Sequence, residues 1–147
     1  MPHFTQAIQR AGPLLQLYIA VSLPRENALR AANQAIPPPL QIFGLVDTGA
    51  SNTSIDDDVV ISLGLTPTGS TLIHTPSTGS NPVTRSTYDV RIIIPGAAGS
   101  NSYTLRALPA TQASLKAQGF HALVGRDILS QCLLVYDGLA NTFSLAF

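Results

Sequence analysis

The spacing of apolar residues constrains this chain most, because it repeats every two positions in several short runs. From Leu15 to Val21 the odd-numbered positions are Leu, Leu, Ile and Val, and from Tyr88 to Ile94 the even-numbered positions are apolar. A period of two places such residues on one face of a β-strand. Frequent glycines and prolines, 11 of each, separate the runs. The pattern predicts a mostly β chain, and the length of 147 residues predicts a single domain over 1–147.

The charge balance excludes one class of partner and favours another. The chain carries 8 basic and 8 acidic side chains, so its formal net charge is zero. Without a basic field to hold a polyanion, we expect no nucleic-acid partner. High apolar content at zero net charge favours a surface that a partner protein covers.

Cysteine content and hydropathy bear on the compartment. Cys132 is the single cysteine, which excludes an intrachain disulfide and a cysteine-based metal site. The most apolar early run, Leu14 to Leu23, is shorter than the roughly 20 residues that cross a bilayer, and it lacks the features of a signal peptide. We expect a cytoplasmic protein with no membrane segment, although a secreted protein without disulfides fits the cysteine count too.

A helical, proline-rich insertion is predicted between the first two strands, over residues 24–39. Pro24 suits the first turn of a helix. Leu29, Ala32 and Ile36 share one helical face, and the three prolines at 37–39 are expected to end the helix. A second apolar strand, Leu40 to Val46, follows.

The rest of the chain reads as one helix, a long hairpin and short elements. Asp56, Asp57 and Asp58 predict a charged helix start rather than a calcium loop, and Gly64 predicts its end. A hairpin is expected over 70–94, with its turn in residues 75–82. Strands at 102–110 and 121–125, a short helix at 126–131 and two strands around a turn in 133–147 complete the domain.

The most distinctive chemical pattern is Asp47-Thr48-Gly49, directly after the second apolar strand. A carboxylate beside a buried strand is costly unless it has partners. Threonine offers a hydroxyl, and glycine lets backbone amides approach the carboxylate closely. The same three residues also form an ordinary Asx-type turn, so on their own they leave a structural and a catalytic role open.

Two motifs in order make the chain resemble the retropepsin-like aspartic proteases, the family of retroviral proteases and their cellular and bacterial relatives. The first is an apolar strand leading into Asp47-Thr48-Gly49-Ala50-Ser51, followed by a helix that closes with Leu63-Gly64-Leu65. The second, Ala122 to Leu129, looks like the family's later signature of strand, Gly-Arg-Asp and helix. The resemblance covers roughly 14–147. It implies a closed β-barrel of the acid-protease type with one or two short helices and a flap hairpin, forming half of a C2 dimer.

The resemblance implies an aspartic endopeptidase that acts on polypeptides by water-activated general acid/base chemistry, with no metal and no cofactor. Such chemistry needs two aspartates. The chain has one Asp-Thr-Gly, so the second Asp47 would come from the other subunit of a homodimer. The C-terminal strand at 141–147, with alternating Phe143, Leu145 and Phe147, is expected to be an apolar edge that pairs with its own copy.

The resemblance also assigns roles to individual residues. Asp47 would be catalytic, and Thr48 and Gly49 would support the active-site loop, Thr48 as a brace between the two subunits. The substrate-binding residues would be Gly49, Ala50, Ser51, Thr75, Pro76, Ser77, Thr78, Gly79 and Leu123. The structural residues would be Gly125, Arg126 and Asp127.

Some features depart from the family pattern. The retroviral enzymes carry an acidic residue where Ser51 stands here, so Asp127 or a backbone carbonyl is the expected partner of Arg126. An alternative function keeps the fold but makes it a non-catalytic dimeric module for peptide binding or assembly. The histidines lack zinc-ligand spacing, and His74 and His121 are expected near the flap and the pocket wall.

Overall fold

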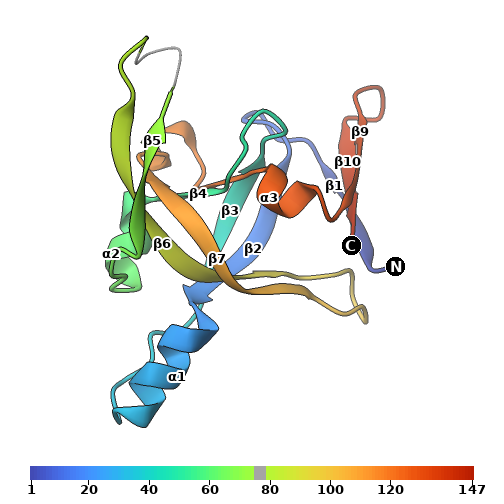
Figure 1. Cartoon of the computed structure of the whole chain (residues 1–147). Helices are drawn as coiled ribbons and strands as arrows, with labels where there is room; N and C mark the ends of the chain where they lie inside the picture. The colour runs from blue at the N-terminus through green and yellow to red at the C-terminus, as the bar shows by residue number, and fades with distance from the viewer. Residues whose placement is uncertain (75–78) are drawn as a thin grey trace.

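The computed structural model describes residues 1–74 and 79–147, and the protein is mostly β (Figure 1). The larger sheet contains β2 (Leu14–Val21), β3 (Leu40–Val46), β4 (Ser54–Asp56), β5 (Gly69–Ile73), β6 (Val83–Ile94), β7 (Tyr103–Ala113) and β8 (Ala122–Val124). The smaller sheet contains β1 (His3–Ala7), β9 (Leu133–Asp137) and β10 (Thr142–Ala146). The helices are α1 (Leu23–Ala31), α2 (Asp57–Ser62), α3 (Arg126–Leu129) and the 3-10 turn η1 (Lys116–Gln118).

Six strands of the larger sheet close into a barrel. They follow the order β2-β3-β8-β4-β7-β6, and β6 then pairs back onto β2 with Val21 opposite Val90. β5 lies outside this ring and extends β6 as an antiparallel hairpin. Closure leaves the six strands without a free edge, so the predicted closed β-barrel with a hairpin is confirmed.

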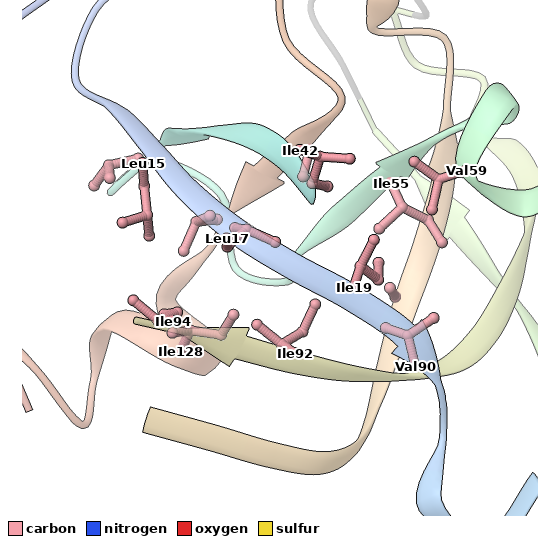
Figure 2. Close-up of a cluster of buried hydrophobic side chains, with 14 of the residues drawn as sticks. Leu15, Leu17, Ile19, Ile42, Ile55, Val59, Val90, Ile92, Ile94 and Ile128 are labelled. Carbon is pink, nitrogen blue, oxygen red and sulfur yellow. The ribbon is translucent and has the colours of Figure 1, made fainter. Parts of the chain in front are cut away.

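The two alternating runs of the sequence supply much of the barrel core. Leu15, Leu17, Ile19 and Val21 of β2 are at most 2% exposed. Val90, Ile92 and Ile94 of β6 lie among the same cluster of buried side chains (Figure 2). Burying a side chain of this size contributes about 1.5–3 kcal/mol relative to leaving it exposed. The predicted inward faces of both strands are confirmed.

The terminal strands form the smaller sheet, and both chain ends lie there side by side (Figure 1). β10 is its central strand, with β1 on one side and β9 on the other. Phe143 and Leu145 of β10 are fully buried. The expectation of an apolar C-terminal edge strand is therefore wrong, because β1 and β9 of the same chain occupy both sides of β10.

Helix α1 is shorter than predicted. Ser22 caps its start by accepting a hydrogen bond from the Arg25 amide, and Pro24 lies in the first turn as expected. The helix ends at Ala31, because Asn33 adopts a left-handed backbone with φ 53°. Ile36 and the three prolines lie beyond its end. The helix projects away from the barrel (Figure 1).

Helix α2 matches its prediction closely. The carboxylate of Asp56 caps it by accepting the Asp58 amide at 2.9 Å, and both following acidic residues lie in the first turn. Gly64 follows the cap residue Leu63 with φ 57°, a backbone that favours glycine. None of the helices in the described part of the chain is long and apolar enough to cross a membrane.

Candidate active site

Asp47 lies where β3 leaves the barrel. β3 runs antiparallel to β2 and parallel to β8, with Val46 opposite Val124. The ladder continues one residue further, since the Asp47 amide donates to the Val124 carbonyl at 3.0 Å. Two neighbouring strands therefore fix the backbone of Asp47, while its side chain is partly exposed.

The loop after Asp47 folds back onto its carboxylate. The amides of Gly49 and Ala50 donate to Oδ1 at 2.9 and 3.3 Å. A Cβ on Gly49 would lie only 3.1 Å from that oxygen, so the close approach favours glycine. The three residues thus form the Asx-type turn that the sequence left open, and this turn orients a carboxylate that lines a groove.

Arg126 clamps the same loop from α3. Its Nη1 donates to the carbonyls of Thr48 and Gly49 at 2.8 and 3.2 Å, and its Nη2 donates to Ser51 Oγ at 2.9 Å. One guanidinium fork thereby satisfies three acceptors of the loop. The expectation of a carbonyl partner for Arg126 agrees with these contacts. Ser51, which stands where the retroviral enzymes carry an acidic residue, is the additional acceptor.

Asp127 binds elsewhere. Its two carboxylate oxygens accept the backbone amide and the hydroxyl of Thr53, each at 2.7 Å, and Thr53 is only 1% exposed. The Thr53 hydroxyl oxygen in turn accepts the Gly125 amide at 3.1 Å. The alternative expectation, Asp127 as the partner of Arg126, is therefore wrong, because these contacts hold its carboxylate on Thr53, the residue before β4.

Gly125 is required by a close backbone approach. A Cβ at this position would lie 2.6 Å from the carbonyl carbon of Asn52 and 2.7 Å from its oxygen. The Gly-Arg-Asp triplet therefore joins α3 to the active-site loop in three ways. Gly125 allows close backbone contact, the Arg126 guanidinium donates hydrogen bonds, and the Asp127 carboxylate accepts them. Thr53, which completes this joint, carries no motif that could have marked it in the sequence.

A groove of about 910 Å³ opens in front of Asp47. Of the residues predicted to act there, its lining includes Asp47, Gly49, Ala50, Ser51 and Leu123. Thr48 is exposed and is not among the described lining residues. Leu123 stands on β8 between Leu45 of β3 and Ser54 of β4. The structure thus brings the two sequence motifs together at one end of the barrel.

The hairpin of β5 and β6 forms one side of this groove. Thr71 pairs with Arg85 and Ile73 pairs with Val83, and all four residues line the groove. His74 lines it as well. The predicted flap residues Thr75, Pro76, Ser77 and Thr78 lie outside the described residues. Gly79 is exposed, with a left-handed backbone at φ 58°.

The segment from the end of β7 into η1 forms another side of the groove, and a carboxylate that the sequence did not single out for this role holds it. Oδ2 of Asp56 accepts the amides of Leu115 and Lys116 at 2.6 and 2.7 Å. Burial acts to raise the pKa of Asp56, but the hydrogen bonds from the amides of Asp58, Leu115 and Lys116 outweigh it and hold that pKa below its usual value. Asp56 thus joins the start of α2 to the groove wall.

His121 and Cys132 both lie outside the groove lining. His121 is on β3's side of the barrel, where its amide donates to the Phe43 carbonyl at 2.9 Å. Cys132 is partly buried after α3, and burial raises the pKa of its thiol. A raised pKa leaves less of the reactive thiolate, which agrees with a packing role for this cysteine.

Comparison with known proteins supports the architecture. No protein-family model matches the chain, and no curated protein sequence matches it. Among solved structures, the chain is similar to the crystal structure of a retropepsin-like aspartic protease from Rickettsia conorii, with a TM-score of 0.58 and 14% sequence identity. The similarity covers 99% of this chain and 90% of that chain. The chain therefore has a retropepsin-like fold.

Proposed function

We propose that the protein is an aspartic endopeptidase and that Asp47 is its catalytic carboxylate. One observation carries the proposal: a carboxylate at the end of a barrel strand, oriented by the Gly49 and Ala50 amides, lines a groove of about 910 Å³. The retropepsin-like fold supports the same reading, because the structurally similar protein from Rickettsia conorii is an aspartic protease.

The proposed chemistry uses a pair of carboxylates that share one proton. Two bare charges about 3 Å apart repel by about 5 kcal/mol at an effective dielectric near 20, so the pair holds a single proton across several pH units. The ionised carboxylate takes a proton from water as that water attacks the scissile carbonyl carbon. The protonated carboxylate gives its proton to the carbonyl oxygen, which yields a tetrahedral gem-diol. As the C–N bond breaks, the proton taken from water passes to the amide nitrogen, and a gem-diol hydroxyl returns a proton to the other carboxylate. No covalent enzyme intermediate forms.

The second carboxylate would come from a second copy of the chain. Asp127, the other aspartate near the loop, is held by Thr53. Asp137 caps the turn after β9 by accepting the amides of Leu139 and Ala140. A C2 homodimer would bring each Asp47 loop opposite its own copy. Thr48 and Gly49 are exposed at the tip of this loop, as such a contact requires.

The substrate would be a polypeptide bound along the groove, beneath the β5–β6 hairpin. Gly49, Ala50 and Ser51 would contact its backbone from below, and Leu123 would contact an apolar side chain. A hairpin that closes over bound peptide would exclude bulk water from the carboxylate pair.

The test compares Asp47→Asn with Asp137→Asn, a matched loss of one carboxylate at an exposed turn. Cleavage of a denatured protein mixture is followed between about pH 3 and about pH 8, where a shared proton predicts a bell-shaped profile. We expect Asp47→Asn to fold and to show only background cleavage, and Asp137→Asn to keep wild-type activity. Wild-type protein that binds peptides but never cleaves them would favour the alternative function, a non-catalytic binding or assembly module.

A further inference from the structure

Two residues of opposite charge line the groove, Asp47 and Arg85. Asp47 is the one carboxylate among its described lining residues, and the proposed chemistry uses it. Arg85 is the one permanent cation among them. Apart from the carboxylate pair, the groove therefore offers positive charge to a bound peptide.

The position of Arg85 places it on the hairpin rather than on the floor. It stands on β6 directly opposite Thr71 of β5, two residues along the strand from the pair of Val83 and Ile73 and therefore on the same face of the hairpin. Both pairs line the groove, so this face of the hairpin is turned toward it. Arg85 is exposed, and none of the ion pairs within the described residues includes it.

Acidic side chains near the groove have other partners. Asp57 accepts hydrogen bonds from Gln112 and Ser114, both at 2.7 Å. Asp58 forms an ion pair with Lys116. Gln112 and Ser114, which line the groove, carry no charge themselves, and these contacts hold the nearby carboxylates on α2.

We propose that Arg85 is a specificity-determining residue that binds the carboxylate of an acidic side chain in the peptide substrate. The inference rests on the proposed function and adds a substrate class to it. A guanidinium presents a planar fork of donors that matches a carboxylate, and a peptide lying under the hairpin would shield the pair from bulk water. The twofold symmetry of the proposed dimer supplies one Arg85 on each side of the scissile bond. The acidic preference therefore falls at two positions that flank the cleavage site.

The experiment uses matched pairs of peptides built on one cleaved sequence. In each pair, a single position near the scissile bond carries Glu in one peptide and Gln in the other, and kcat/KM is measured for both. We expect the wild type to prefer Glu about fivefold to tenfold at a flanking position, as a partly shielded ion pair would give. The preference should decrease as salt concentration rises.

Three variants assign the preference to Arg85. Arg85→Gln should bring the Glu-to-Gln ratio of kcat/KM close to one. Arg85→Glu should bring this ratio below one and should favour a third peptide that carries Lys at the same position. Arg106→Gln, which removes the same charge from an exposed position of β7 outside the groove lining, should keep the wild-type ratio.

The possible failures are distinguishable. If the wild type cleaves both members of every pair at equal rates, or Arg85→Gln keeps the preference, the role of Arg85 is wrong and the protease assignment stands. If the wild type cleaves no peptide at all, the proposed function fails, and the inference fails with it.

Discussion

The carboxylate of Asp127 receives two hydrogen bonds from Thr53, one from the backbone amide and one from the hydroxyl, each 2.7 Å long. The two residues are 74 positions apart in the chain. The contact fixes α3 against the segment that leads into β4, and Arg126, the neighbour of Asp127, then reaches the active-site loop from α3. The loop that carries Asp47 is therefore supported from outside itself.

Removing the Thr53 hydroxyl should destabilise the protein without emptying any volume. Thr53→Val leaves Asp127 with one donor fewer and leaves the Gly125 amide without its acceptor. We expect the free energy of unfolding to fall by about 2–4 kcal/mol, since Gly125 is buried and the Asp127 carboxylate is partly buried. Denaturant titration measures the change. Thr104→Val, an exposed position on β7, is the matched control and should change stability by less than about 0.5 kcal/mol. A Thr53→Val protein as stable as the control would contradict this role.

The serine under Arg126 allows a graded test of the clamp. Ser51→Ala removes one acceptor of the guanidinium, and Ser51→Asp replaces it with a carboxylate. We expect stability to increase in the order Ala, Ser, Asp, with steps of about 0.2–1 kcal/mol because Arg126 is exposed.

A higher salt concentration should reduce the stability difference between Ser51→Asp and the wild type. Only the introduced carboxylate forms an ion pair with Arg126, and salt screens ion pairs. Denaturant midpoints of both proteins at low and high salt measure this difference. A Ser51→Asp protein less stable than the wild type at low salt would show that the guanidinium is not available to the new carboxylate.

Asp56 should make the free energy of unfolding depend on pH in the acidic range. Its pKa in the folded state lies below the unfolded value of about 3.9. Folding therefore favours its ionised form, so its contribution is complete above the unfolded pKa and is lost as pH falls through the folded-state pKa. Asn has one acceptor oxygen and cannot serve both the Asp58 amide and the amides of Leu115 and Lys116.

We expect Asp56→Asn to lose about 2–4 kcal/mol of unfolding free energy at neutral pH, and the gap to the wild type to narrow below about pH 4. Asp58→Asn, which removes the exposed ion pair with Lys116, should cost no more than about 1 kcal/mol. Chemical denaturation at several pH values measures both variants. A gap that stays constant down to about pH 3 would contradict the ionised state of Asp56.

The sequence predicted the elements whose signals are local. The two alternating strands, the capped helix α2 and the hairpin follow from periodicity and capping, because these depend on residues close in the chain. Strands β1 and β4 were missed. In β1 only Phe4 is buried, and β4 has three residues, so neither shows a period; their partners β10, β7 and β8 lie far along the chain.

The candidate site likewise has a part that the sequence predicted and a part that depends on long-range contacts. The residues of the two motifs were placed near one another by resemblance, and the structure brings them together at one end of the barrel. The contacts of Ser51, Thr53 and Asp56 depend on which segments the closed barrel makes neighbours. The end of α1 just before Asn33 was missed for a local reason, since asparagine tolerates the left-handed backbone that stops a helix.

The most direct test of the central claim, that two Asp47 carboxylates from two subunits form one catalytic site, is an activity titration by subunit mixing. Wild-type protein is mixed with a roughly ninefold excess of Asp47→Asn under conditions that let subunits exchange. Random pairing leaves only about a tenth of the wild-type subunits in wild-type dimers. Because a mixed dimer carries one good aspartate, the account predicts activity near a tenth of that of wild type diluted equally in buffer. Activity equal to the diluted wild type, from a species that sediments as a monomer, would contradict it.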